Sequence, residues 1–315
     1  MQGTARAPGT CGELVQGKIN GINFLVTCPV DMFSEVTARL NTQGVVLADK
    51  SLPKVKLAAE KTLQFLGRPE MGAEVRVTSS VPCGKGMASS TADIAATCAA
   101  VAVGLGTCLT PTEIAEIALS IEPTDGLMFS GISLFDHVDG KACRFLGNAP
   151  ALETVIVDLG GTIDTIGFNA NAELEILNRL KEHQVAAALE KMERAVASGD
   201  SWLVGEAATE SAFAHQQILF KPELAGLVEI CRRLGGVGVN VAHSGTVVGL
   251  LFETGRIAAD RVLKTLAREG FGDMFKARII DGGVEVLRES AGEKSWQPLD
   301  AYMEGTYGKL RRNTG

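Results

Sequence analysis

Residues 79–93, SSVPCGKGMASSTAD, join two very different sequence patterns. Before them, residues 73–78 alternate apolar and charged side chains, which predicts a β-strand. After them, residues 94–103 are rich in alanine and contain no proline or glycine, which predicts a buried helix. A strand, a loop and a helix in this order bring free backbone N–H groups to the positive end of the helix dipole. The junction therefore predicts an anion site, and nucleotide phosphates are the anion that it suits best.

The make-up of the loop favours this interpretation over a simple turn. Its glycines alone would only shape a turn, and Ser89 and Ser90 alone would only cap the helix. Together with a proline and a lysine at a strand-to-helix junction, they favour phosphate binding. The spacing is neither that of a Walker P-loop nor that of a dinucleotide-binding fingerprint. The expected phosphate contacts are Pro82, Cys83, Gly84, Lys85, Gly86, Met87, Ala88, Ser89, Ser90 and Thr91.

The bulk properties restrict the class of protein. At 315 residues and 46% apolar content, the chain is long enough for one large or two ordinary domains. A net charge of −7 argues against nucleic acid or an anionic membrane as the main partner, so we expect small-molecule partners. Seven cysteines without a C-x-x-C pair suggest neither a disulfide framework nor a zinc site. With no signal-peptide pattern and no run of 18 apolar residues, we expect a cytoplasmic protein.

The rest of the chain reads as an α+β protein. The first half is expected to hold short strands, two helices and a hairpin, at 2–7, 13–16, 23–28, 33–40, 55–65, 114–121 and 132–146. The second half alternates long helices with strands, at 154–158, 170–198, 202–219, 223–234, 237–242, 247–252, 257–268, 277–280 and 284–287. We expect domains over 1–150 and 151–290, followed by a polar tail over 291–315.

Two further segments accompany the loop. APGTCGELVQG at 7–17 precedes it, and NVAHSGTVVG at 240–249 lies far beyond it. In order and separation the three segments resemble the motifs of the GHMP kinases, and the loop is similar to that family's P-x-x-x-G-[LM]-x-S-S pattern. The third segment departs from the usual glycine-rich form by carrying His243 and Ser244. The resemblance covers about residues 6–290 and implies an N-terminal domain like the second domain of ribosomal protein S5 and a C-terminal ferredoxin-like domain.

Several segments resemble one branch of that family, the L-threonine kinases: CGEL at 11–14, CPVD at 28–31, KGMASSTAD at 85–93, EPTD at 122–125, LFDH at 134–137 and NVAHSG at 240–245. This resemblance implies ATP, Mg²⁺ and phosphorylation of the hydroxyl of L-threonine, for the aminopropanol linker of adenosylcobalamin.

Phosphoryl transfer needs a phosphate cradle, a cation and a group that positions or deprotonates the attacking hydroxyl. Asp125 is the expected base, and Lys85 is expected to bring positive charge to the phosphates. Ser90, or Ser89, and Glu122 are the expected magnesium ligands, because Mg²⁺ takes few protein oxygens. The alternatives are that Lys85 is solvated and that the two acids belong to a helix end and an Asp-Gly turn.

Substrate recognition requires partners for an ammonium and a carboxylate. Glu13 and Asp31 are the candidates for the ammonium, and Asp31 as a turn residue is the alternative. His243 is expected to contact a carboxylate or phosphate, beside Ser244 and Gly245, and Gly245 permits a close backbone approach. His137 follows a predicted strand, and the sequence leaves open whether it contacts a ligand or packs in the interior. The remaining histidines lie in helical patterns.

Two other functions remain open at this point. A homoserine kinase needs a pocket longer by one methylene, a difference that gives only roughly 10–200-fold discrimination. A protein of this fold that binds a metabolite without catalysis is the second alternative. The presence of Ser90, Glu122 and Asp125 argues against it.

Overall fold

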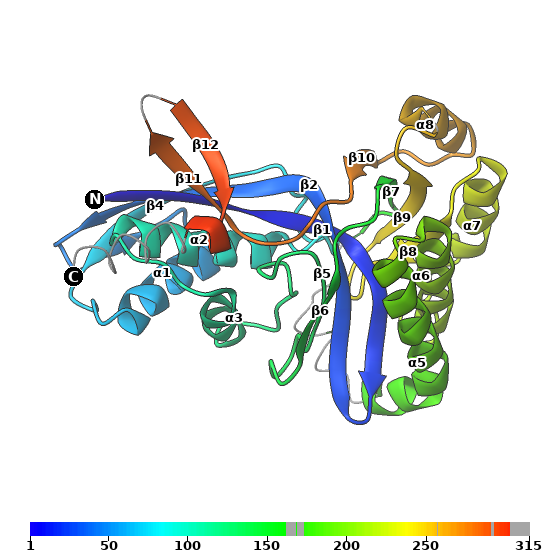
Figure 1. Cartoon of the computed structure of the whole chain (residues 1–315), viewed down its shortest axis with the longest axis horizontal. Helices are drawn as coiled ribbons and strands as arrows, with labels where there is room; N and C mark the ends of the chain where they lie inside the picture. Colours follow the sequence, from blue (N-terminus) through cyan, green and yellow to red (C-terminus); the bar gives the residue numbers. More distant parts are fainter. Residues whose placement is uncertain (162–167, 169–172, 257, 291–292, 303–315) are drawn as a thin grey trace.

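A long antiparallel hairpin runs through the molecule. In this computed structural model, which describes residues 1–161, 168, 173–256, 258–290 and 293–302, β1 (Gln2–Ile19) and β2 (Ile22–Asn41) pair along most of their length. The sequence predicts four shorter strands here. The structure joins them because bulges near Gly9 and Glu13 absorb the irregular residues without ending the pairing. Figure 1 shows the hairpin (blue) extending from the first three helices to the foot of α5.

The first half of the chain builds a sheet with helices packed on it. β4 (Gly72–Ser79) pairs with β2, and the short β3 (Val46–Leu47) pairs with β4. The helices are α1 (Pro53–Phe65), α2 (Ser89–Gly104) and α3 (Pro111–Leu119). α2 is almost entirely buried, as its alanine-rich sequence predicts, and a Cβ on Gly3 of β1 would lie 2.1 Å from the Ala100 carbonyl oxygen. The predicted hairpin is β5 (Ile132–Phe135) with β6 (Cys143–Gly147), and β5 pairs with β2.

The second half forms a four-stranded antiparallel sheet with helices in the connections. In chain order it holds β7 (Leu152–Asp158), α5 (Leu174–Ser198), α6 (Ser201–His215), α7 (Leu224–Arg233), β8 (Gly238–Val241), β9 (Val247–Glu253), α8 (Ala259–Arg268) and β10 (Met274–Arg278). The strand order β10-β7-β9-β8 is that of a ferredoxin-like βαββαβ unit. The first residues of the helix predicted over 170–198 lie outside the described residues. β8 also pairs with β1 where Glu13 faces Val241, so one sheet continues through both halves.

The end of the described chain returns to the first half. β11 (Glu285–Ser290) pairs with β1 and with β12 (Glu293–Pro298). Residues 293–298 of the expected polar tail form β12, where Trp296 stacks on the guanidinium of Arg6, 4.5 Å from ring centroid to Cζ, and the following Leu299 is buried. Among the described helices, none combines the length and apolarity needed to cross a membrane.

Candidate active site

The loop before α2 adopts a left-handed backbone that places the helix start at the site. Gly84 and Gly86 have φ values of 72° and 82°, and Ala88, the residue that precedes the helix, has φ 56°. No side chain caps α2, so the alternative in which Ser89 and Ser90 only cap the helix is wrong. They lie in the first helical turn because alanine occupies the capping position. Their hydroxyls are thus available to a ligand at the positive end of the helix.

The other two sequence segments hold this loop in place. A Cβ on Gly245 would lie 2.3 Å from the Cα of Gly86, so the two backbones touch. The Thr246 N–H donates to the Lys85 carbonyl (3.0 Å), and the Thr10 N–H donates to the Met87 carbonyl (3.0 Å). The three segments that resemble the family motifs therefore meet in space, and Gly245 acts through backbone packing.

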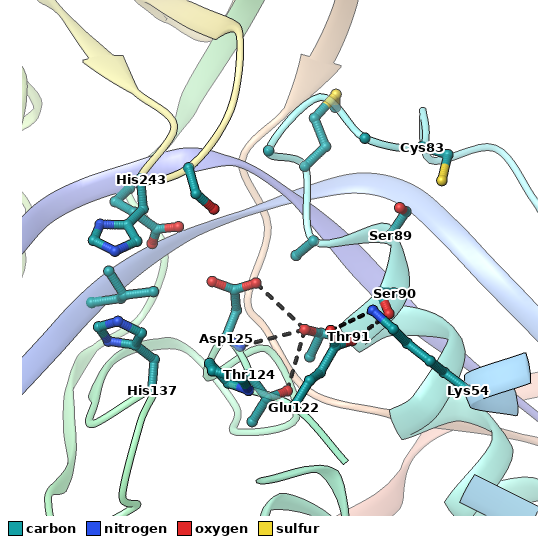
Figure 2. A pocket seen from close by; sticks show the side chains of 18 residues that line it. Lys54, Cys83, Ser89, Ser90, Thr91, Glu122, Thr124, Asp125, His137 and His243 are labelled. Carbon is teal, nitrogen blue, oxygen red and sulfur yellow. Dashed lines mark hydrogen bonds and ion pairs between the residues drawn. The ribbon is translucent and has the colours of Figure 1, made fainter. Parts of the chain in front are cut away.

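A cavity of about 270 Å³ lies between these segments. Figure 2 shows the hydroxyls of Ser89 and Ser90 at one end, Asp125 between, and His137 and His243 at the other end. Its lining residues are Glu13, Leu25, Lys54, Cys83, Gly84, Gly86, Met87, Ala88, Ser89, Ser90, Thr91, Glu122, Pro123, Thr124, Asp125, His137, His243 and Ser244.

Glu122 links the loop helix to a lysine. Ser90 Oγ donates to one carboxylate oxygen of Glu122, and Lys54 Nζ pairs with the other. Glu122 is 8% exposed, whereas the Lys54 side chain is 40% exposed. A buried carboxylate and a serine hydroxyl side by side, next to the phosphate loop, are the kind of oxygen ligands that Mg²⁺ takes in company with phosphate and water.

Asp125 lies at the centre of the cavity and is held by the first turns of α2. Its backbone N–H donates to Thr91 Oγ1 (3.4 Å), whose hydroxyl is 3.5 Å from Asp125 Oδ2 and 3.2 Å from Thr124 Oγ1. Burial, and then the charge of Glu122, raise the pKa of Asp125 to about 6. A carboxyl group with a pKa near neutrality can accept a proton from a substrate hydroxyl and release it again.

Glu13 lies beside Asp125 and is buried. It comes from the bulged stretch of β1, and one of its carboxylate oxygens has no hydrogen-bond partner among the described residues. Burial, and then the charge of Asp125 and a hydrogen bond with it, raise the pKa of Glu13 well above its usual value. An unpartnered buried carboxyl oxygen in a cavity is suited to an incoming cationic group.

The third segment brings His243 to the cavity wall. Its Nδ1 lies 2.8 Å from Gln16 Oε1, and its ring meets that of His137 edge to face at 4.9 Å. Ser244 also lines the cavity, as the sequence predicts.

Four expected site residues do not line the cavity, and one of them is Gly245, which packs on Gly86 instead. The ammonium of Lys85 pairs with Asp158 Oδ2 at 2.6 Å and also donates to the Gly161 carbonyl. Asp31 accepts from the backbone and side chain of Arg278, on another face. Pro82 does not line the cavity. The glycine-loop pattern cannot reveal which way its lysine turns, because the partner aspartate comes from β7.

Sequence reasoning missed Lys54 and left His137 open. Lys54 follows Pro53 at the start of α1, and no motif marks it. His137 follows β5, at the end of a motif that resembles the threonine kinases, and this was the only signal for it.

The fold and the cavity define a small-molecule kinase. The chain matches the family models "GHMP kinases N terminal domain" over residues 53–133 and "GHMP kinases C terminal" over residues 185–271. It belongs to the GHMP kinase family, as the sequence motifs predict, and the expected fold is confirmed.

One relative, the L-threonine kinase of Citrobacter freundii, is 35% identical over 90% of this chain and 99% of its own length. Two solved structures show the same fold. One is a homoserine kinase from Cytophaga hutchinsonii, with TM-score 0.68 and 18% identity over 90% of this chain and 97% of that one. The other is MDDEF in complex with MVAPP, AMPPCP and magnesium, with TM-score 0.68 and 19% identity over 92% of this chain and 99% of that one.

Proposed function

We propose that this protein transfers the γ-phosphoryl group of ATP to the side-chain hydroxyl of L-threonine, which gives O-phospho-L-threonine for the aminopropanol linker of adenosylcobalamin. The observation that carries the proposal is the placement of Asp125, a half-buried carboxyl group with a pKa near 6, beside Thr91 in the first turn of α2. The similarity to a named L-threonine kinase along 90% of the chain supports the choice of substrate. The reaction would take place in the cytoplasm.

The loop and the start of α2 bind the triphosphate through backbone N–H groups and the hydroxyls of Ser89 and Ser90. Ser90 and Glu122 would hold Mg²⁺, which neutralises charge on the phosphate oxygens when it is bound. Their adjacency fits this role, and Lys54 then lies beside the metal and phosphates. One solved structure with the same fold contains AMPPCP and magnesium. This supports a nucleotide and Mg²⁺ as the molecules that this cavity binds.

Asp125 orients the threonine hydroxyl and accepts its proton as the hydroxyl oxygen attacks phosphorus. Glu13 binds the ammonium, because its free carboxyl oxygen lies in the same cavity. His243 and Ser244 form the wall against which the amino acid lies. Lys85 contributes by holding the loop to Asp158 rather than by touching phosphate.

The experiment is a coupled assay of ADP release with ATP and Mg²⁺ against threonine, serine, homoserine and mevalonate. We expect the highest kcat/KM with threonine. Highest turnover on homoserine would favour the alternative assignment as a homoserine kinase. Threonine binding with no ADP release from any of the four would favour a metabolite-binding protein without catalysis.

A further inference from the structure

Two buried lysines lie next to the histidine end of the cavity. Lys181 on α5 is 0% exposed, and Lys221, which follows α6, is 5% exposed. His215 lies between Lys181 and the cavity wall, with its ring 5.5 Å from that of His243. Within the described part of the chain, neither lysine has a carboxylate within ion-pair distance. Burying an ammonium group without a counter-ion lowers the stability of the folded protein. The burial of two such groups side by side with the cavity therefore suggests a functional reason.

Hydrogen bonds fix the direction of each donor in this cluster. His215 Nε2 lies 2.8 Å from the His243 carbonyl, so it carries the hydrogen, and His215 Nδ1 accepts from Lys181 at 3.3 Å. Gln16 donates through its amide nitrogen to the Val241 carbonyl, so its oxygen accepts from His243 Nδ1. Lys221 donates to the Gly245 carbonyl at 2.8 Å. The lysines therefore tie back the loop that forms the cavity wall.

Burial lowers the pKa of Lys181 to about 7 and that of Lys221 to about 8, so both amines keep their proton more readily once an anion lies nearby. Burial also lowers the pKa of His243 well below its usual value, and the neighbouring basic groups His137, His215, Lys181 and Lys221 lower it further. Burial also lowers the pKa of His137 to about 4, so this ring is neutral at physiological pH. A neutral imidazole still carries one N–H, and His137 Nδ1 has no hydrogen-bond partner among the described residues. His137 therefore offers an uncommitted nitrogen beside His243, whose loop the two lysines hold from behind.

Resting on the proposed kinase function, we infer that this end of the cavity binds an anionic group, the carboxylate of the hydroxy amino acid. His137 donates a hydrogen bond to it, and Lys181 and Lys221 supply the compensating charge from behind the loop. Lys181 and Lys221 are positioning residues that do not touch the substrate. Glu13 lines the same cavity and would bind the ammonium, so the site can bind both charged groups of a zwitterionic amino acid.

The test compares L-threonine with 1-amino-2-propanol, which has the same hydroxyl and amine but no carboxylate. The ratio of the two kcat/KM values is measured in the wild type, Lys181→Met, Lys221→Met and the control Lys191→Met. Lys191 lies on α5, as Lys181 does, but it pairs with Glu206 and Glu210 at the surface. Because both substrates are tested on one preparation, the ratio does not depend on the folded fraction. Methionine is nearly as long as lysine and removes both the charge and the hydrogen bonds to His215 and the Gly245 carbonyl.

We expect the wild type to prefer threonine by at least about 100-fold. Each buried-lysine variant should reduce this preference by about tenfold, or ~1.4 kcal/mol, through a higher KM for threonine, while Lys191→Met leaves it unchanged. An equal loss for both substrates would show a merely structural role and overturn the inference. An unchanged ratio together with a higher KM for ATP would also overturn the inference, because the charge of the lysines would then act on the nucleotide phosphates. Absence of phosphorylation of either substrate by the wild type would remove the proposed function, and the inference with it.

Discussion

The carboxyl group of Asp125 lies close enough to that of Glu13 inside the cavity to raise its pKa, although the two residues come from distant parts of the chain. Glu13 is in the long first strand, and Asp125 is in the loop after α3. Two neighbouring carboxyl groups shielded from bulk water do not both ionise readily, so the pair retains a proton to a higher pH than either acid would alone. This pair connects the proposed ammonium site with the proposed base.

The first prediction concerns the base. Asp125→Asn should lower kcat by about 10²–10⁴-fold, because the amide cannot accept the proton of the attacking hydroxyl. The melting temperature should stay the same or rise, because a buried ionisable group is removed. Asp260→Asn, at an exposed position on α8, is the matched control. Turnover within a factor of three of the wild type would remove Asp125 from the mechanism.

The second prediction concerns pH and Glu13. In the folded protein burial raises the pKa of Glu13 well above its ordinary value of 4.5. Above pH 4.5 the unfolded chain releases a proton that the folded protein keeps, so this group lowers stability as pH rises. Glu13→Gln should therefore stabilise the protein more at pH 8 than at pH 5, measured by urea unfolding without ligands. A gain that is equal at both pH values would contradict the raised pKa.

The third prediction concerns the metal. Glu122→Gln should raise the Mg²⁺ concentration needed for half-maximal activity by about 10-fold or more, because it weakens a proposed ligand. Glu116→Gln, on the exposed face of α3, serves as the control. Titration of activity with Mg²⁺ at saturating ATP measures both. An unchanged requirement would place the metal elsewhere.

The fourth prediction concerns Lys85. Lys85→Met should lower the free energy of unfolding by about 2 kcal/mol, because the carboxylate of Asp158, whose side chain is 2% exposed, loses its cation. The double variant with Asp158→Asn should recover most of this loss. kcat should fall by less than about tenfold, in contrast to Asp125→Asn. A loss of kcat as large as that of Asp125→Asn, with stability unchanged, would restore the catalytic role that the sequence predicts.

The fifth prediction concerns the contact between two loops. Gly245→Ala should destabilise the protein by about 1–3 kcal/mol and raise the KM for ATP, because the added methyl group meets the backbone of Gly86. Gly226→Ala on α7, where a Cβ meets nothing within 4 Å, is the control. It should raise stability slightly, since alanine favours a helix. If both substitutions had the same effect, the loop contact would not matter.

Much of the site could be predicted from the sequence, because its parts lie within short segments. Residues 83–91 carry their own signal, since glycine, serine and a helix start determine a phosphate loop locally. Lys85 shows the limit, because its direction depends on Asp158, more than seventy residues away. Lys181 gave no signal either: in a helical pattern it looks like a surface residue, and only the tertiary packing buries it.

The fold was predictable to a similar extent. The alanine-rich α2 and the capping box at Thr110 and Glu113 follow from local sequence. The joining of four short strands into β1 and β2 does not, because bulges preserve pairing through glycine and proline.

The unbroken course of β1 has a consequence for how the protein can be divided. This strand borders β11 and β2 near its start and β8 at Glu13, so a single ribbon belongs to both halves of the enzyme. A cut near residue 150 would leave the second piece with β8 as a bare edge, open to pairing with other chains. The two halves are therefore expected to be inherited, expressed and folded as one unit, and separate fragments should aggregate unless they are produced together.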